Sequence, residues 1–362
     1  MNHITIIAGA RPNFMKVAPI IHEIQKRKAG GVDIDYSLIH TGQHYDKKMS
    51  GDFFEQLNIP EPNANLSAGG GTQAEQTGAI MIRFEEHLIK NPTDLVLVVG
   101  DVTSTMACAI TAQKLHFKVA HVEAGIRSND WSMPEEINRL VTDSITNYFF
   151  TTSDIANANL KASGYSDKQI FFVGNCMIDT LLANRPRFIR PLIWEKLDLC
   201  EKGYLVITLH RPANVDEGSK LKELMDEIIY NTQEMPLVFP VHPRTKTMLN
   251  ELGIEHERLH LVDPMSYLEF NYLVERSFAV VTDSGGITEE TTVMGVPCLT
   301  LRDNTERPET VIVGTNELIG TNPKNIAPAM KTLFAGEWKK GGIPELWDGK
   351  TAGRIVTHLI EL

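Results

Sequence analysis

The stretch 95–125, LVLVVGDVTSTMACAITAQKLHFKVAHVEAG, decides the fold class. It begins with the apolar run Leu95–Val99, continues through a helix-like segment at Thr103–His116, and returns to an apolar run at Val119–Val122. Two short Val-rich runs separated by one helical segment are typical of a βαβ unit, whose strands are parallel. The stretch therefore predicts a parallel sheet with helices on its faces.

The same alternation extends in both directions along the chain. Further strands are expected at Ile4–Ala8, Tyr36–His40, Tyr148–Phe150, Ile170–Val173, Leu205–Leu209, Leu237–Val241, Leu259–Val262, Ala279–Thr282 and Cys298–Leu301. Helices are expected at about Phe14–Lys28, Ala74–Lys90, Glu135–Asn147 and Ala156–Ala162. The alternation breaks at Ala183–Pro191, which holds two prolines and three arginines and is interpreted as a linker. This pattern predicts two doubly wound α/β domains that face a central cleft.

Length and composition agree with two folded domains. The chain has 362 residues, 42% hydrophobic and 22% charged, with a formal charge of −11. A length of this size corresponds to about two domains, at roughly 100–200 residues each. The acidic balance argues against a surface that binds nucleic acid or an anionic membrane, because both need a basic stripe.

The cysteines and the N-terminus indicate a cytoplasmic protein. Cys108, Cys176, Cys200 and Cys298 are far apart, without the spacing of a zinc site, which favours reduced thiols. The first apolar stretch is too short for a signal peptide, and no run of 18 apolar residues suggests a membrane span. We expect no metal.

Unusual polar residues follow the expected strands of the first half. The turn Gly9–Lys16 leads into a helix, so its backbone N–H groups, with Arg11 and Lys16, are expected to face an anion. Asp101 and Glu123 follow neighbouring strands, and Glu135 with Glu136 opens a helix. Acids brought together here would repel each other and raise at least one pKa, which suits general acid–base chemistry. One of the two helix glutamates is also explained by the helix dipole.

The second half carries the stronger anion-binding pattern. The segment Thr282–Glu290, TDSGGITEE, ends a strand, places two glycines and opens a helix, as a phosphate-binding nest requires. Glu290 is placed to accept hydrogen bonds from a sugar diol, and Arg307 follows the next strand. The pair His210–Arg211 at another strand end is suited to neutralising a diphosphate.

Taken together, these motifs resemble the non-hydrolysing UDP-N-acetylglucosamine 2-epimerase family. The resemblance runs over nearly the whole chain, in order, through 9–19, 40–46, 100–105, 121–128, 133–139, His210–Arg211, 282–290 and 302–309. It implies two Rossmann-like domains of the GT-B type. They would span residues 1–173 and 192–352, with a hinge at 174–191 and a C-terminal helix at about 353–362 packing back on the first domain.

The resemblance also implies a reaction and a set of site residues. The family inverts C2 of the sugar by eliminating UDP to a 2-acetamidoglucal, without a cofactor or metal, as a homodimer. The matching catalytic positions are Asp101, Glu123, Glu135 and His210. The matching substrate contacts are Arg11, Lys16, Arg139, Phe270, Ser284, Gly285, Gly286, Glu290 and Arg307. Gln43 and His44 match an allosteric site in some members, although the stretch 66–73 lacks the arginine that such members use.

The sequence leaves several functions open. The leading one is an isomerase that interconverts UDP-GlcNAc and UDP-ManNAc for cell-surface polysaccharide synthesis. An alternative is a 2-epimerase of a modified UDP-sugar such as UDP-2,3-diacetamido-glucuronate. A GT-B glycosyltransferase, a hydrolysing epimerase and an inactive nucleotide-sugar sensor rank lower. The sequence does not say which carboxylate is the base.

Overall fold

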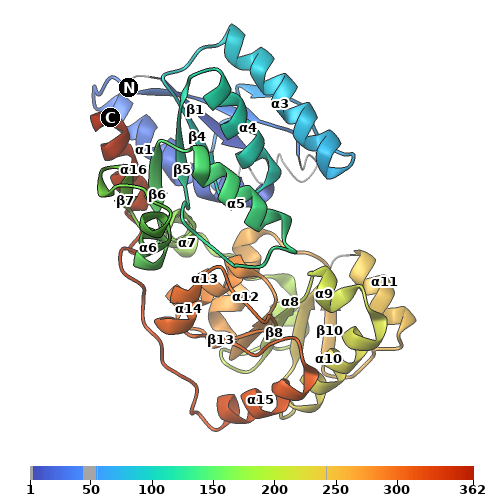
Figure 1. Ribbon diagram of the computed structural model, residues 1–362. Coiled ribbons are helices and arrows are strands. Elements are labelled where there is room, and N and C mark those ends of the chain that lie inside the picture. The colour runs from blue at the N-terminus through green and yellow to red at the C-terminus, as the bar shows by residue number, and fades with distance from the viewer. Residues whose placement is uncertain (1–2, 44–53, 55, 242) are drawn as a thin grey trace. The chain divides into compact units, whose positions relative to one another are not determined.

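The computed structural model describes residues 3–43, 54, 56–241 and 243–362, with the side chains of 212–213 and 243–244 excepted. The chain divides into two compact units, drawn in Figure 1. The first unit contains residues 1–183 together with 345–362, and the second contains residues 184–344.

The first unit is built on a parallel sheet. Among its described residues, seven strands lie in the order β3-β2-β1-β4-β5-β6-β7, and every neighbouring pair is parallel. The strands are β1 (His3–Ala8), β2 (Asp35–His40), β3 (Ala64–Asn65), β4 (Leu95–Val99), β5 (Lys118–Val122), β6 (Tyr148–Thr151) and β7 (Ile170–Phe172). The long helices are α1 (Arg11–Ala29), α3 (Gln73–Lys90), α4 (Thr103–Lys114), α5 (Pro134–Ile145), α6 (Asp154–Ala162), α7 (Cys176–Asn184) and α16 (Thr351–Glu361).

The C-terminal helix belongs to the first unit. Helix α16 lies beside α1 (Figure 1). The carboxylate of Asp179 on α7 accepts hydrogen bonds from the backbone N–H groups of Thr351 and Ala352, at 3.1 and 2.7 Å. The indole of Trp347 donates to the carbonyl of Thr152 at 3.1 Å. The last segment of the chain is therefore held by buried polar contacts as well as by apolar packing.

The second unit repeats the plan with six described strands, in the order β10-β9-β8-β11-β12-β13. These are β8 (Leu205–Thr208), β9 (Leu237–Pro240), β10 (Leu259–Val262), β11 (Ala279–Thr282), β12 (Cys298–Thr300) and β13 (Asn316–Leu318). Its helices are α8 (Leu192–Lys196), α9 (Pro212–Val215), α10 (Gly218–Tyr230), α11 (Pro243–Glu251), α12 (Tyr267–Arg276), α13 (Gly285–Met294), α14 (Pro308–Ile312) and α15 (Ile326–Phe334).

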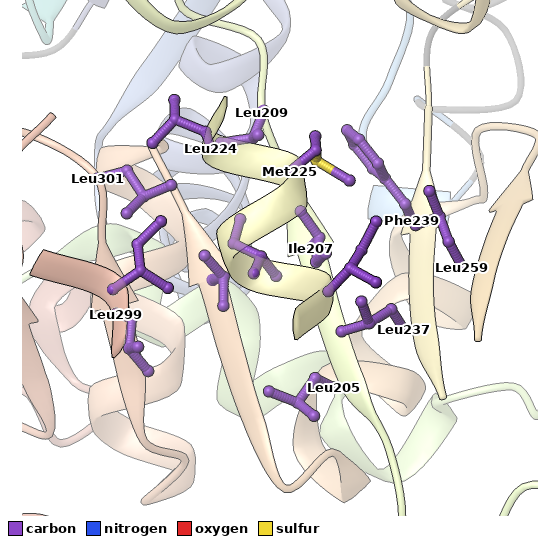
Figure 2. Close-up of a cluster of buried hydrophobic side chains, with 14 of the residues drawn as sticks. Leu205, Ile207, Leu209, Leu224, Met225, Leu237, Phe239, Leu259, Leu299 and Leu301 are labelled. Carbon is purple, nitrogen blue, oxygen red and sulfur yellow. The ribbon is translucent and has the colours of Figure 1, made fainter. Parts of the chain in front are cut away.

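Apolar side chains cover both faces of the second sheet. Leu205 and Ile207 of β8 point into one buried cluster, where Figure 2 shows them with Met225 of α10 and Phe239 of β9. Val206, between them, packs into a separate cluster on the opposite face. A parallel strand that is buried on both faces consists of a continuous run of apolar residues. These strands could therefore be predicted from the sequence.

The predicted α/β fold with two parallel sheets is confirmed, and the differences lie at edges and connections. The strands β3 and β13, which the sequence did not mark, are the outermost strands of their sheets. Each is two or three residues long and carries polar residues, because an edge strand is only partly covered. Residues 176–184, expected within a hinge, form the helix α7 instead.

No described helix combines the length and the apolar character that crossing a bilayer requires.

Candidate functional site

Each sheet has one point where the strand order reverses direction. In the first unit this point lies between β1 and β4, and in the second between β8 and β11. Ligands of doubly wound sheets bind beyond the carboxyl ends of the strands at such points. The residues that follow these strands are Gly9, Asp101, His210 and Asp283, so the polar motifs of the sequence lie where a ligand is expected.

Asp101, which follows β4 after Gly100, is held by an arginine from α5. The Nε and Nη2 atoms of Arg139 lie 3.0 and 2.7 Å from Asp101 Oδ2. The side-chain amide of Asn138 donates to the backbone carbonyl of Asp101 at 2.8 Å. The Arg139 side chain is 3% exposed, whereas that of Asp101 is 30% exposed. The carboxylate is thus oriented from the protein side while its other face reaches solvent.

Glu123, directly after β5, is paired with a lysine from α1. The Nζ of Lys16 lies 2.5 Å from Glu123 Oε2, and both side chains are mostly buried. The backbone of Glu123 has a φ of +70°, a left-handed conformation that is costly for a residue with a Cβ. Strain of this kind persists only where the surrounding structure holds it, and it concentrates at functional sites.

The two glutamates at the start of α5 have different environments. Glu136 is buried and accepts hydrogen bonds from the backbone N–H groups of Ser128 and Asn129 and from Arg139. Burial opposes its ionisation, but these donors hold the pKa of Glu136 below its ordinary value. Glu135 is half-buried. Glu136 is therefore a structural anion that positions the arginine holding Asp101, and Glu135 is the glutamate open to another role.

Two of the acids for which the sequence predicted mutual repulsion are held in ion pairs. The sequence predicted carboxylates that repel one another. Instead, Asp101 and Glu123 are each paired with a cation, Arg139 and Lys16 respectively. The ion pairs reduce any repulsion and position both oxygens. Both cations were expected to bind substrate, and in the structure each also contacts a candidate acid.

Two of the backbone donors that were expected to face an anion in the turn Gly9–Lys16 are used within the turn. The side-chain oxygen of Asn13 accepts hydrogen bonds from the backbone N–H groups of both Gly9 and Ala10, each at 3.0 Å. Helix α1 begins at Arg11, and its second position is Pro12, which has no N–H. The side chain of Arg11 is exposed and supplies positive charge at this turn.

Gln43, one of the two residues that match an allosteric site, contacts the start of α4. The side-chain oxygen of Gln43 accepts hydrogen bonds from the backbone N–H and the hydroxyl of Ser104, at 3.0 and 2.7 Å. His44 lies outside the described residues. The stretch 66–73 has no arginine of its own, but Arg83 on α3 donates to the carbonyls of Leu66 and Ser67. Sequence reasoning missed this arginine because it is distant along the chain.

In the second unit, a buried aspartate organises the loop after β8. Asp283 is completely buried and accepts hydrogen bonds from the backbone N–H groups of His210 and Arg211 and from Asn214. Its Oδ1 lies 2.8 Å from Nδ1 of His210, whose side chain is mostly exposed. Burial opposes ionisation, but the hydrogen bond and charge of His210 hold the pKa of Asp283 below its ordinary value. The histidine thus presents Nε2 outward. Asp283 belongs to the motif Thr282–Glu290, but the sequence of that motif did not reveal the contact between Asp283 and His210.

The start of α13 retains the features of an anion site. Ser284 is the N-cap residue, and its side chain makes no capping hydrogen bond to the helix. The first N–H groups of a helix have no partner within it and carry the positive end of the dipole. Gly285 has no side chain over this turn, where an added Cβ would lie 2.9 Å from Glu306 Oε1. Backbone donors at Gly285 and Gly286 can therefore approach a ligand closely.

Two further predicted contacts in this unit are the buried Glu290 and the half-buried Phe270. The hydroxyl of Tyr267 donates to Glu290 Oε1 at 2.8 Å. Burial raises the pKa of Glu290 to about 7, with the charge of Glu289 acting in the same direction. Phe270 is half-buried and packs beside the cluster on that face of the sheet.

Arg307, expected near the nest, forms an ion pair with the buried Glu289 of α13. Both side chains are almost fully buried. The arginine therefore balances an acid on the same helix that carries the nest.

The fold is that of a GT-B-like α/β enzyme. The family model described as UDP-N-acetylglucosamine 2-epimerase matches residues 24–360. The chain belongs to this family of isomerases, and the predicted family is confirmed.

Several relatives are similar over their whole length. The UDP-N-acetylglucosamine 2-epimerase of Methanocaldococcus jannaschii is 40% identical over 374 aligned positions, covering 98% of each chain. The UDP-2,3-diacetamido-2,3-dideoxy-D-glucuronate 2-epimerase of Pseudomonas aeruginosa is 38% identical over 368 positions and all of both chains. The crystal structure of the Methanocaldococcus jannaschii UDP-GlcNAc 2-epimerase in complex with UDP-GlcNAc and UDP has a TM-score of 0.88. It is 39% identical, and the match covers 99% of this chain and all of that one.

Proposed function

We propose that this chain is a non-hydrolysing UDP-N-acetylglucosamine 2-epimerase that interconverts UDP-GlcNAc and UDP-ManNAc. The observation that carries the proposal is the pair of carboxylates, Asp101 and Glu123, at the ends of the adjacent strands β4 and β5. Each is oriented by its own buried cation. Similarity to the UDP-N-acetylglucosamine 2-epimerases supports the choice of substrate.

The first unit supplies the acid–base groups. A base removes the proton at C2 while the bond between C1 and the UDP oxygen breaks, which leaves a double bond between C1 and C2. UDP then adds back at C1 as C2 accepts a proton on its opposite face. Asp101, Glu123 and Glu135 are the groups proposed to move this proton. One proton leaves C2 and another is returned to its opposite face, and nothing is oxidised or reduced, so the step requires no redox cofactor.

The second unit binds the UDP. The diphosphate is placed at the start of α13, on Ser284, Gly285 and Gly286, where backbone donors stabilise negative charge on the leaving group. His210, oriented by Asp283, contributes a further donor. The remaining proposed contacts are Glu290 for the ribose, Phe270 for the base, and Arg11, Lys16, Arg139 and Arg307 for the charges of the nucleotide sugar.

The finer assignments rest on the family resemblance. We propose a homodimer that acts in the cytoplasm and supplies a precursor of cell-surface polysaccharides. The four free cysteines, three of them buried, are consistent with a reducing compartment. We propose that the hinge lies within residues 174–191, because the chain passes from the first unit to the second between residues 183 and 184.

The test is incubation with UDP-GlcNAc in D2O, followed by NMR. We expect deuterium at C2 and equilibration with UDP-ManNAc, without an added cofactor. The Asp101→Asn variant should not exchange, while Glu255→Gln, which replaces an exposed acid, should match the wild type. Recovery of unlabelled UDP-GlcNAc would remove this substrate, and release of free sugar would indicate a hydrolysing enzyme.

A second candidate substrate is UDP-2,3-diacetamido-glucuronate. It is favoured by the relative from Pseudomonas aeruginosa, which is 38% identical over all of both chains. Running the same D2O experiment on both UDP-sugars distinguishes the two, because the physiological substrate should exchange at the higher kcat/KM.

A further inference from the structure

The strand β5 carries a buried histidine whose two ring nitrogens both face acceptors. His121 is fully buried. Its Nε2 lies 2.8 Å from the backbone carbonyl of Gly100, and its Nδ1 lies 2.8 Å from Asp143 Oδ1 on α5. A neutral imidazole has one N–H and one lone pair, so it can donate to only one of these groups.

The hydrogen-bond partners of His121 and Asp143 indicate which of their atoms carry hydrogen. A carbonyl oxygen can only accept, so Nε2 carries a hydrogen. The other oxygen of Asp143 accepts from Arg127 Nη1 at 2.6 Å and from the backbone N–H of Gly125 at 3.1 Å. These two donors, one of them a guanidinium, favour the ionised carboxylate of Asp143 over the neutral acid. An ionised Asp143 requires that Nδ1 also donates.

We propose that His121 is a buried imidazolium ion and that, with Asp143, it is a positioning pair for the two acids Asp101 and Glu123. This inference rests on the proposed function for the roles of those acids. His121 holds the carbonyl of Gly100, which directly precedes Asp101. Asp143 holds the N–H of Gly125, two residues after Glu123.

The pair thereby links the two loops that follow β4 and β5. The backbone N–H of Gly100 also donates to the carbonyl of Val122, at 3.0 Å, which ties the same loops a second time. Glu123 sits between these attachments in its left-handed conformation. Loss of the imidazolium proton would leave one acceptor without a donor and release one end of the link.

A second buried histidine in this unit provides the matched control. His40 is also buried, but its Nδ1 accepts a hydrogen bond from the backbone N–H of Gly42 at 2.8 Å. Burial lowers the pKa of His40 to about 4. His40 is therefore expected to be neutral, with its proton on Nε2.

The charge state is tested by long-range proton–nitrogen NMR of the histidine-labelled protein at neutral pH. We expect two protonated ring nitrogens for His121, and one protonated and one unprotonated nitrogen for His40. The His121→Gln variant assigns the signal. Asp143→Asn keeps the ring but removes the charge, and should convert His121 to the neutral form. An unprotonated nitrogen in wild-type His121 would overturn the proposal.

The positioning role is tested by kinetics. Both variants should lower kcat for C2 exchange by about 10- to 100-fold, as expected for displaced catalytic groups, with little change in the Kd for UDP. An unchanged kcat, or a parallel loss of UDP affinity, would contradict this role. If the wild type exchanges no tested UDP-sugar, the proposed function and the positioning role fail, while the NMR signals still decide the charge. If His121→Gln does not fold, the proposal is tested by the wild-type NMR spectrum and by the NMR spectrum and kcat of Asp143→Asn.

Discussion

Replacing Glu290 with glutamine is expected to stabilise the second unit at alkaline pH. Glu290 lies on α13, is 4% exposed and accepts a hydrogen bond from Tyr267. Burial raises its pKa from 4.5 to about 7, so above neutral pH the fold holds a buried, unfavourable charge. A glutamine keeps an acceptor oxygen for the tyrosine and cannot ionise.

The magnitude follows from linkage between protonation and folding. Between pH 4.5 and about 7 the folded state retains a proton that the unfolded state has lost. The free energy of unfolding therefore falls as pH rises through this window, by at most about 1.4 kcal/mol for each pH unit. The total loss is roughly 3 kcal/mol and is complete above about pH 7. Below about pH 4.5 this group makes no difference to stability.

The measurement is urea unfolding of the wild type and Glu290→Gln at about pH 5 and about pH 8.5, on either side of the window. Tryptophan fluorescence serves as the signal, since Trp194 and Trp338 lie in this unit. Comparing the two proteins at each pH cancels the titration of all other groups. The matched control is Glu289→Gln on the same helix, which breaks the ion pair with Arg307 and should destabilise at both pH values. The same stability difference between wild type and Glu290→Gln at both pH values would refute the reasoning.

Three further predictions follow from single contacts. Asp101→Asn should abolish C2 exchange while calorimetry finds UDP affinity nearly unchanged, and a collapse of that affinity would assign Asp101 to nucleotide binding instead. Arg139→Leu should cost about 3–5 kcal/mol of unfolding free energy, because it removes a buried cation shared by two carboxylates. A loss below about 1 kcal/mol in urea titration would contradict that estimate. Gly9→Ala should destabilise by about 1–3 kcal/mol, since its Cβ would lie 2.0 Å from Ser104 Oγ. The matched control, Gly78→Ala, lies in open space on α3 and should instead stabilise by up to about 1 kcal/mol in urea titration of both variants.

The central strands were predictable because burial on both faces leaves a direct trace in the sequence. Val96 and Val98 pack in one cluster, and Val206 and Val280 pack in another, so polar residues are excluded from these runs. The edge strands β3 and β13 leave no such trace. The helix α7 was missed because its segment adjoins a stretch with two prolines and three arginines.

The candidate site was predictable in position but not in its connections. The sequence placed Asp101, Glu123, His210 and Ser284 after strands, and in the structure each of them follows a strand of its sheet. The bonds from Gly9 and Ala10 to Asn13 span only three or four residues at the start of a helix, and the sequence analysis missed this capping role.

The sequence by itself determined the α/β class, the central strands and the family, because each depends on local residue order. Only the tertiary structure decided which charges meet: Lys16 with Glu123, Arg139 with Asp101, and His210 with Asp283. The partners in each pair are 38 to 107 residues apart. The energy of an ion pair depends on distance and burial, which the order of residues along the chain does not contain.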